Sequence, residues 1–95
     1  MPKQSLQTFT LGTAVKITTK LSVSNPSSVK ITVEDPTEAV KTNLVDMTQD
    51  TPNTYHYVYQ SATTDEDGLY IVTIRAVYGA YTALSQTKFE LIDLE

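Results

Sequence analysis

The chain contains one histidine, His56, which is the first residue to consider for acid–base or nucleophilic chemistry. Nucleophilic catalysis needs such a base beside a serine, threonine or cysteine. The chain has no cysteine, and none of its serines lies in a Gly-x-Ser-x-Gly turn. His56 is flanked by Tyr55 and Tyr57 in an alternating segment, which is typical of a residue on a sheet face. We therefore predict no catalytic residues and no enzyme activity.

Asp65-Glu66-Asp67 is the one acidic run, and it raises the question of a calcium site. Calcium takes several carboxylate oxygens from a loop that wraps around it. Three consecutive acids cannot all point at one ion, and the spacing Asp-x-Asp-x-Asp-Gly is absent. A site would need a further acid from another loop, such as Asp35, Asp46 or Asp50. A solvated turn is the prediction, with no metal and no cofactor, and calcium binding stays as an alternative.

Four of the six tyrosines have a structural explanation. Tyr55, Tyr57 and Tyr59 share one face of a predicted strand, and Tyr70 lies on another. Rings on one face can fill the core of a sandwich while their hydroxyls reach its rim. We predict that these four side chains are core or near-core residues.

Tyr78 and Tyr81 differ, because they flank Gly79-Ala80, which is the tip of a predicted hairpin. Tyrosine at a loop tip offers a large contact area at a low cost in conformational entropy. We predict Tyr78, Gly79 and Tyr81 as a possible partner contact. The alternative is that the two rings pack on each other across the turn.

Period-two alternation, rich in valine and threonine, runs through most of the chain and predicts strands. Segment 48–53, with Pro52 and Asn53, reads as a turn, and a bulge is expected near Ser85. Lysines at positions 16, 20, 30 and 41 are a usual defence of strand edges. The predicted strands are 6–11, 13–23, 29–34, an irregular edge strand near 42–46, 54–60, 69–78 and 81–94. For the segment near 42–46, a single helical turn is the alternative.

The chain is acidic, with a net charge of −4 in 95 residues. Such a chain gains nothing from phosphate neutralisation, and an anionic membrane surface repels it. We therefore predict neither nucleic-acid nor membrane binding. The absence of cysteine excludes disulfides.

About seven half-buried antiparallel strands in 95 residues predict one all-β domain, 1–95, folded as a β-sandwich of two facing sheets. A small closed barrel is the alternative fold. Leu91, Ile92 and Leu94 are costly to leave in water, so the last strand either completes this sheet or joins a partner subunit.

The stretch Glu66-x-Gly68-x-Tyr70-x-Val72 resembles the corner between strands E and F of immunoglobulin-like domains. The resemblance implies that the Tyr70 hydroxyl bonds back to upstream backbone. It places Val72 where that family has its second cysteine and Ile17 at the partner position. We therefore predict Gly68, Tyr70 and Val72 as a structural corner. The chain departs from the family in having no cysteine and no tryptophan.

The serial order of further motifs is similar to small immunoglobulin-like virion proteins of tailed phages and archaeal viruses. That resemblance implies a non-enzymatic capsid decoration or head or tail component, made in the host cytoplasm, whose partners are capsid or tail subunits or copies of itself. The chain also looks like modules of prokaryotic cell-surface proteins, so an extracellular adhesion or spacer role is the alternative. A carbohydrate- or calcium-binding sandwich is a third. The motifs are Phe9 and Gly12, Val15-x-Ile17, Pro26-x-Ser28-Val29-x-Ile31-x-Val33-x-Asp35-Pro36, Met47-Thr48, Tyr55-x-Tyr57-x-Tyr59, Gly68-x-Tyr70-x-Val72-x-Ile74-x-Ala76 and Phe89.

Overall fold

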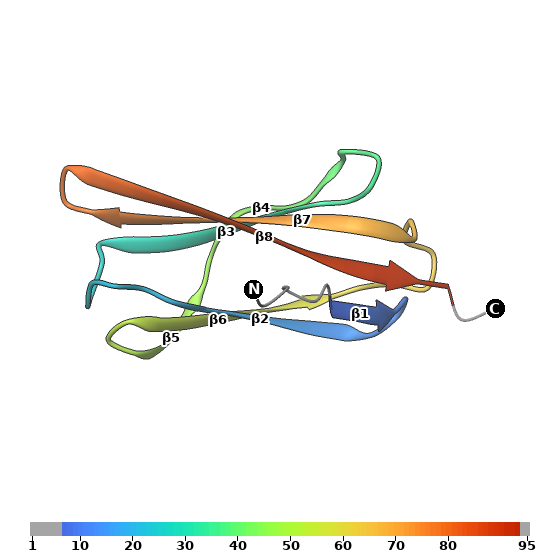
Figure 1. Ribbon diagram of the computed structural model, residues 1–95, viewed down its shortest axis with the longest axis horizontal. Coiled ribbons are helices and arrows are strands. Elements are labelled where there is room, and N and C mark those ends of the chain that lie inside the picture. Colours follow the sequence, from blue (N-terminus) through green and yellow to red (C-terminus); the bar gives the residue numbers. More distant parts are fainter. Residues whose placement is uncertain (1–6, 94–95) are drawn as a thin grey trace, which may run out of the picture.

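The computed structural model describes residues 7–93, which form eight strands and no helix. Five strands form one sheet in the order β1-β8-β7-β3-β4, and three form the other in the order β2-β6-β5. The two sheets lie as facing layers (Figure 1). The predicted all-β sandwich is confirmed, and no helix of the described residues could span a membrane. The strands are β1 (Gln7–Thr10), β2 (Ala14–Lys20), β3 (Ser28–Glu34), β4 (Val40–Asp46), β5 (Thr48–Thr51), β6 (Thr54–Gln60), β7 (Gly68–Tyr78) and β8 (Tyr81–Ile92).

Alternating side chains explain why β2, β3 and β7 form. Along β3 the valines and isoleucine are buried, whereas the residues between them are partly exposed. One face of each strand therefore enters the core and the other meets water, as the period-two pattern predicts. The core includes Val15 and Ile17 from one sheet and Ile31, Val33 and Val72 from the other.

An aromatic cluster joins the two sheets. The rings of Tyr70 and Phe89 stack with centroids 5.3 Å apart, and Tyr59 of the facing sheet lies 6.1 Å from Tyr70 and 6.3 Å from Phe89. Phe9 meets Phe89 edge to face at 6.1 Å. Tyr55 is also buried and Tyr57 packs against the core, so the predicted burial of the four tyrosines is confirmed. These rings lie where the two sheets meet.

Three expectations need correction. Thr48–Thr51, predicted as part of a turn, forms the additional strand β5. This segment is fully exposed and has no apolar alternation, but it pairs with β6. β1 pairs with β8 in parallel, so the sheet is not wholly antiparallel. The register between β7 and β8 runs without a shift through Ser85, so no bulge lies there. Register shifts instead interrupt the pairing of β3 with β4 and of β5 with β6.

The last strand completes the sheet of its own chain. Leu91 is fully buried in the core, whereas Ile92 is partly exposed. Leu94 lies outside the described residues. Of the two predicted outcomes, completion of the chain's own sheet is therefore the correct one for Leu91.

The loop between β3 and β4 is held by the side chain of Asp35. Its Oδ1 accepts hydrogen bonds from the Thr37 hydroxyl at 2.7 Å, the Thr37 N–H at 2.8 Å and the Ala39 N–H at 2.9 Å. These donors, the Thr37 hydroxyl foremost, hold the pKa of the Asp35 carboxyl below its usual value. Asp35 is thus a structural acid that shapes this loop.

Candidate interaction surface

The predicted corner lies at the start of β7. The Tyr70 hydroxyl donates to the Glu66 carbonyl oxygen at 2.7 Å, which is the upstream backbone bond that the sequence led us to expect. Gly68 has φ +131°, and a Cβ there would lie 2.9 Å from Cγ of Pro36. Val72 is fully buried, in the same core cluster as Ile17. These residues hold the chain where it enters β7 and expose no reactive group.

Replacing Tyr70 by phenylalanine should lower the free energy of unfolding by about 1 kcal/mol, because it removes one hydrogen bond and keeps the buried ring. Urea denaturation at neutral pH would measure the loss. Tyr81→Phe is the matched control, because that side chain is 77% exposed and should leave the unfolding midpoint unchanged. Equal midpoints for Tyr70→Phe and the wild type would contradict a stabilising corner bond.

Burial also makes the stability of the fold sensitive to alkali. Burial chiefly, and then the charge of Asp65, raises the pKa of Tyr70 from 10.0 to about 12, and burial raises the pKa of Tyr59 as well. In the unfolded chain each phenol ionises near pH 10. The stabilisation from the neutral phenols is therefore complete below pH about 10 and is lost as the pH rises toward about 12.

We expect the free energy of unfolding to fall across that interval, and to fall less steeply in Tyr70→Phe than in the wild type. Guanidinium denaturation at several pH values would compare the slopes. Identical slopes would show that ionisation of Tyr70 is not linked to unfolding.

The acids of the run 65–67 do not converge on a common point. Asp65 is tied into the fold: its Oδ2 accepts from the Tyr59 hydroxyl at 3.3 Å and from the Ala62 N–H at 2.8 Å, and Lys41 lies 3.4 Å from its Oδ1. Glu66 and Asp67 are exposed. Within residues 7–93, no group of three or more histidine or acidic side chains is arranged to hold a metal ion.

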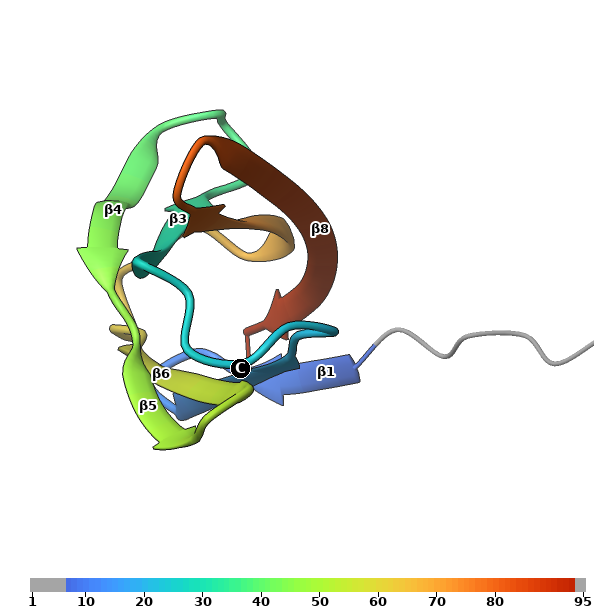
Figure 2. The same cartoon turned by 90° about the vertical axis from the view of Figure 1, so that its left-hand side faces the viewer.

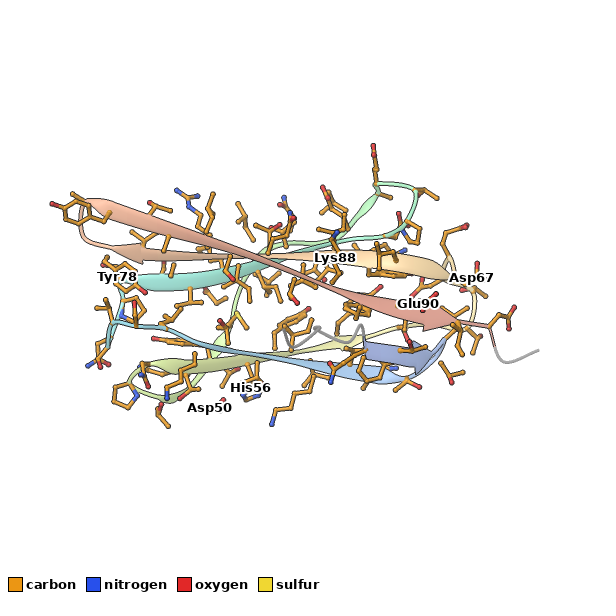
Figure 3. The ribbon with its side chains drawn as sticks, viewed as in Figure 1. Asp50, His56, Asp67, Tyr78, Lys88 and Glu90 are labelled. Carbon is orange, nitrogen blue, oxygen red and sulfur yellow. The ribbon has the colours of Figure 1, made fainter. Side chains whose placement is uncertain are left out.

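His56 lies on the outward side of β6, beside Asp50 (Figure 3). Its Nδ1 is 2.8 Å from one carboxylate oxygen of Asp50 and 2.9 Å from the other. In the described part of the chain no hydroxyl bonds to Nε2, so the pair lacks a nucleophile. The contact ties β6 to its edge neighbour β5.

A hollow of about 380 Å³ lies beside the corner. It opens to solvent, and its walls combine acidic side chains with apolar ones. Of its acidic side chains, Asp35 already bonds the loop. It is lined by Glu34, Asp35, Pro36, Glu38, Leu69 and Ile71.

The hairpin Tyr78–Tyr81 forms as predicted, with Gly79 at φ +57° in a two-residue turn. Tyr78 lies at the end of the sandwich away from Asp67 (Figure 3). Tyr81 is 77% exposed, whereas Tyr78 is partly buried against the core. The two residues face each other across the turn, but in residues 7–93 no ring contact joins them. Of the predicted contact, Tyr81 and Gly79 are accessible, and Tyr78 also supports the core.

Leu84 is an exposed residue that the sequence reasoning missed. It is 69% exposed on β8, the highest value for any aliphatic side chain among residues 7–93. Alternation predicted its strand, but only the sheet order shows that this part of β8 lies at an edge. Tyr81 and Leu84 are thus the most exposed large apolar side chains of the described chain, although they lie on opposite faces of β8, and we call the segment Tyr81–Lys88 the β8 edge.

No protein-family model matches this chain, and a search of curated proteins finds no match.

Proposed function

We propose that this chain is a non-enzymatic structural protein that works by protein–protein contact, as an accessory of a viral particle such as a capsid decoration or a head or tail component. The observation that carries the contact role is the exposure of Tyr81, at 77%, beside the turn of the hairpin. A large exposed aromatic side chain at a loop tip is typical of binding surfaces.

Three features support a structural role over a chemical one. His56 and Asp65, the groups most capable of chemistry, are engaged in holding β5 and the loop 61–67. The aromatic cluster lies in the core and offers no ligand site. The hollow near Pro36 is open to solvent, and its Asp35 carboxylate already bonds the loop.

The viral part of the proposal, and an immunoglobulin-like assignment of the sandwich, are supported by the serial motifs in the sequence. The hydrogen bond from Tyr70 to the Glu66 carbonyl adds support, since immunoglobulin-like domains pin the same corner through a tyrosine. On a particle with many equivalent sites, weak contacts at one small surface gain strength from multivalency.

Mass spectrometry of particles purified from the virus that encodes the chain would test this proposal. We expect the chain to be present in many copies per particle. Its absence from purified particles would overturn the viral role. Recovery as part of a longer protein on a cell surface would instead support the adhesion or spacer alternative.

Binding to particles that lack the chain would test the surface. Tyr81→Ala should weaken binding and leave the unfolding midpoint unchanged, because the side chain is exposed. Val58→Ala is the matched control, since Val58 is 47% exposed on the other sheet. Equal binding by both variants would contradict a role for the hairpin.

A further inference from the structure

We propose that two copies of this chain associate by antiparallel pairing of their β8 edges. The proposal concerns self-association and stands apart from the viral role. A protein that pairs with itself and is absent from particles would support self-association and overturn the viral role.

Among residues 7–93, no strand pairs with the outer side of the β8 edge. β1 pairs with β8 only from Phe89 to Ile92, and β7 lies on the other side. The Leu11 N–H donates to the Ile92 carbonyl oxygen at 2.9 Å, so the backbone polar groups of Ile92 point toward β1. Because these groups alternate in direction along a strand, those of Thr82, Leu84 and Gln86 point to the same side, where no described strand meets them. Figure 2 shows β8 along the side of the molecule, reaching β1 only near its end.

The other edges of the two sheets are protected in ways that the β8 edge is not. β2 carries Lys16 and Lys20, both exposed. β1 and β5 have only 4 residues each, and the pairing of β4 is interrupted by register shifts. Charge, shortness and bulges are the usual means of preventing edge-to-edge pairing. The β8 edge has no proline, no register shift against β7 and a single charge, Lys88.

A second copy fits this edge because the edge is complementary to itself. A two-fold axis perpendicular to the sheet keeps side chains on their own faces. With the axis at Leu84, that residue faces Leu84 of the other copy, and Thr82 faces Gln86. Each of these pairs can exchange both backbone hydrogen bonds, and the two exposed leucines cover each other. Sliding the register toward the end of β8 would bring the second copy against β1, which begins opposite Phe89.

Electrostatics permit this register. No charged residue faces another across the axis, because Lys88 lies beyond the paired segment. The nearest like charges are the Arg75 side chains, since Arg75 pairs with Leu84 on β7. Three strand spacings of about 4.8 Å would separate them by about 14 Å, which exceeds the Debye length of about 8 Å at physiological salt.

The contact is small, so the dimer should be weak. Interfaces below about 1,200 Å² are typical of transient association. We expect a dissociation constant in the micromolar range or above, and association that ends at the dimer, because the pairing uses up both edges.

Sedimentation velocity of the full chain across the micromolar to millimolar range should show a monomer–dimer equilibrium. The double variant Thr82→Lys/Gln86→Glu places opposite charges face to face at two symmetric positions and should tighten the dimer roughly fivefold. Thr82→Glu/Gln86→Glu places like charges there and should weaken it by a similar factor. Both variants alter exposed side chains, and circular dichroism would verify their folding.

Leu84→Lys should weaken the dimer at least about tenfold, because it replaces the central apolar contact by two facing lysines. Val40→Lys is the matched control, with the same added charge on β4 at the opposite edge of the same sheet, and should leave association unchanged. A wild type that stays monomeric throughout would overturn the proposal. Three other results would also overturn the proposal. They are a dissociation constant unchanged by Leu84→Lys, the same change in that constant for both double variants, and species larger than a dimer.

Discussion

Replacing Phe89 by alanine should remove about 3–5 kcal/mol from the free energy of unfolding. Phe89 is 3% exposed and its ring touches those of Phe9, Tyr59 and Tyr70, so its loss opens a cavity at the point where the two sheets meet. Domains of this size have roughly 5–15 kcal/mol in total. The variant should therefore unfold at a far lower urea concentration, or be partly unfolded without denaturant.

Leu84→Ala is the matched control, because it removes a large apolar side chain from the same strand at a site that is 69% exposed. Its effect should stay within about 0.5 kcal/mol, provided that the measurement is made at concentrations where the chain is monomeric. A loss below about 1 kcal/mol for Phe89→Ala would mean that the aromatic cluster is not the centre of the core.

Gly68→Ala should cost about 3 kcal/mol, because two penalties combine. The φ of +131° belongs to a region that only glycine adopts easily, and the new Cβ would lie 2.9 Å from Cγ and 3.2 Å from Cβ of Pro36. A proline ring is rigid, so either the loop between β3 and β4 or the start of β7 would have to move. Thermal and urea unfolding would measure the loss.

Gly79→Ala separates backbone strain from the clash. Gly79 also has positive φ, +57°, but a Cβ there would meet nothing within 4 Å. It should cost only about 1–2 kcal/mol, the ordinary penalty of a left-handed residue. Equal losses at the two glycines would show that Pro36 yields to the new methyl group.

Sequence patterning predicted the strands that have one solvent-exposed face and one buried face. β2, β3 and β7 alternate clearly, and β6 was predicted with its observed bounds. β5 was missed since both of its faces are exposed, so only its pairing with β6 defines it. The parallel pairing of β1 with β8 brings together segments that are far apart in the sequence, and no local sequence pattern predicts such a contact.

The same limit applies to the candidate surface. The sequence treats Tyr78 and Tyr81 alike, as two tyrosines beside one turn. The structure separates them, because Tyr78 lies on a strand with neighbours on both sides while Tyr81 begins a strand at the edge. Leu84 was unremarked since exposure at an edge depends on sheet order. The corner was predictable, because Glu66, Gly68 and Tyr70 are close in sequence and form it locally.

The pairing of β1 with β8 also bears on how the chain reaches its native state. The Thr8 hydroxyl and a carboxylate oxygen of Glu90 are 3.4 Å apart across 82 positions of sequence. Bringing together residues so far apart has a large entropic cost, and folds dominated by such contacts form slowly. During synthesis residues 7–10 stay without their sheet partner until residues 89–92 have been made. β8, whose segment 81–88 meets no other described strand beyond β7, is thus also the strand that must be made before β1 can join the larger sheet.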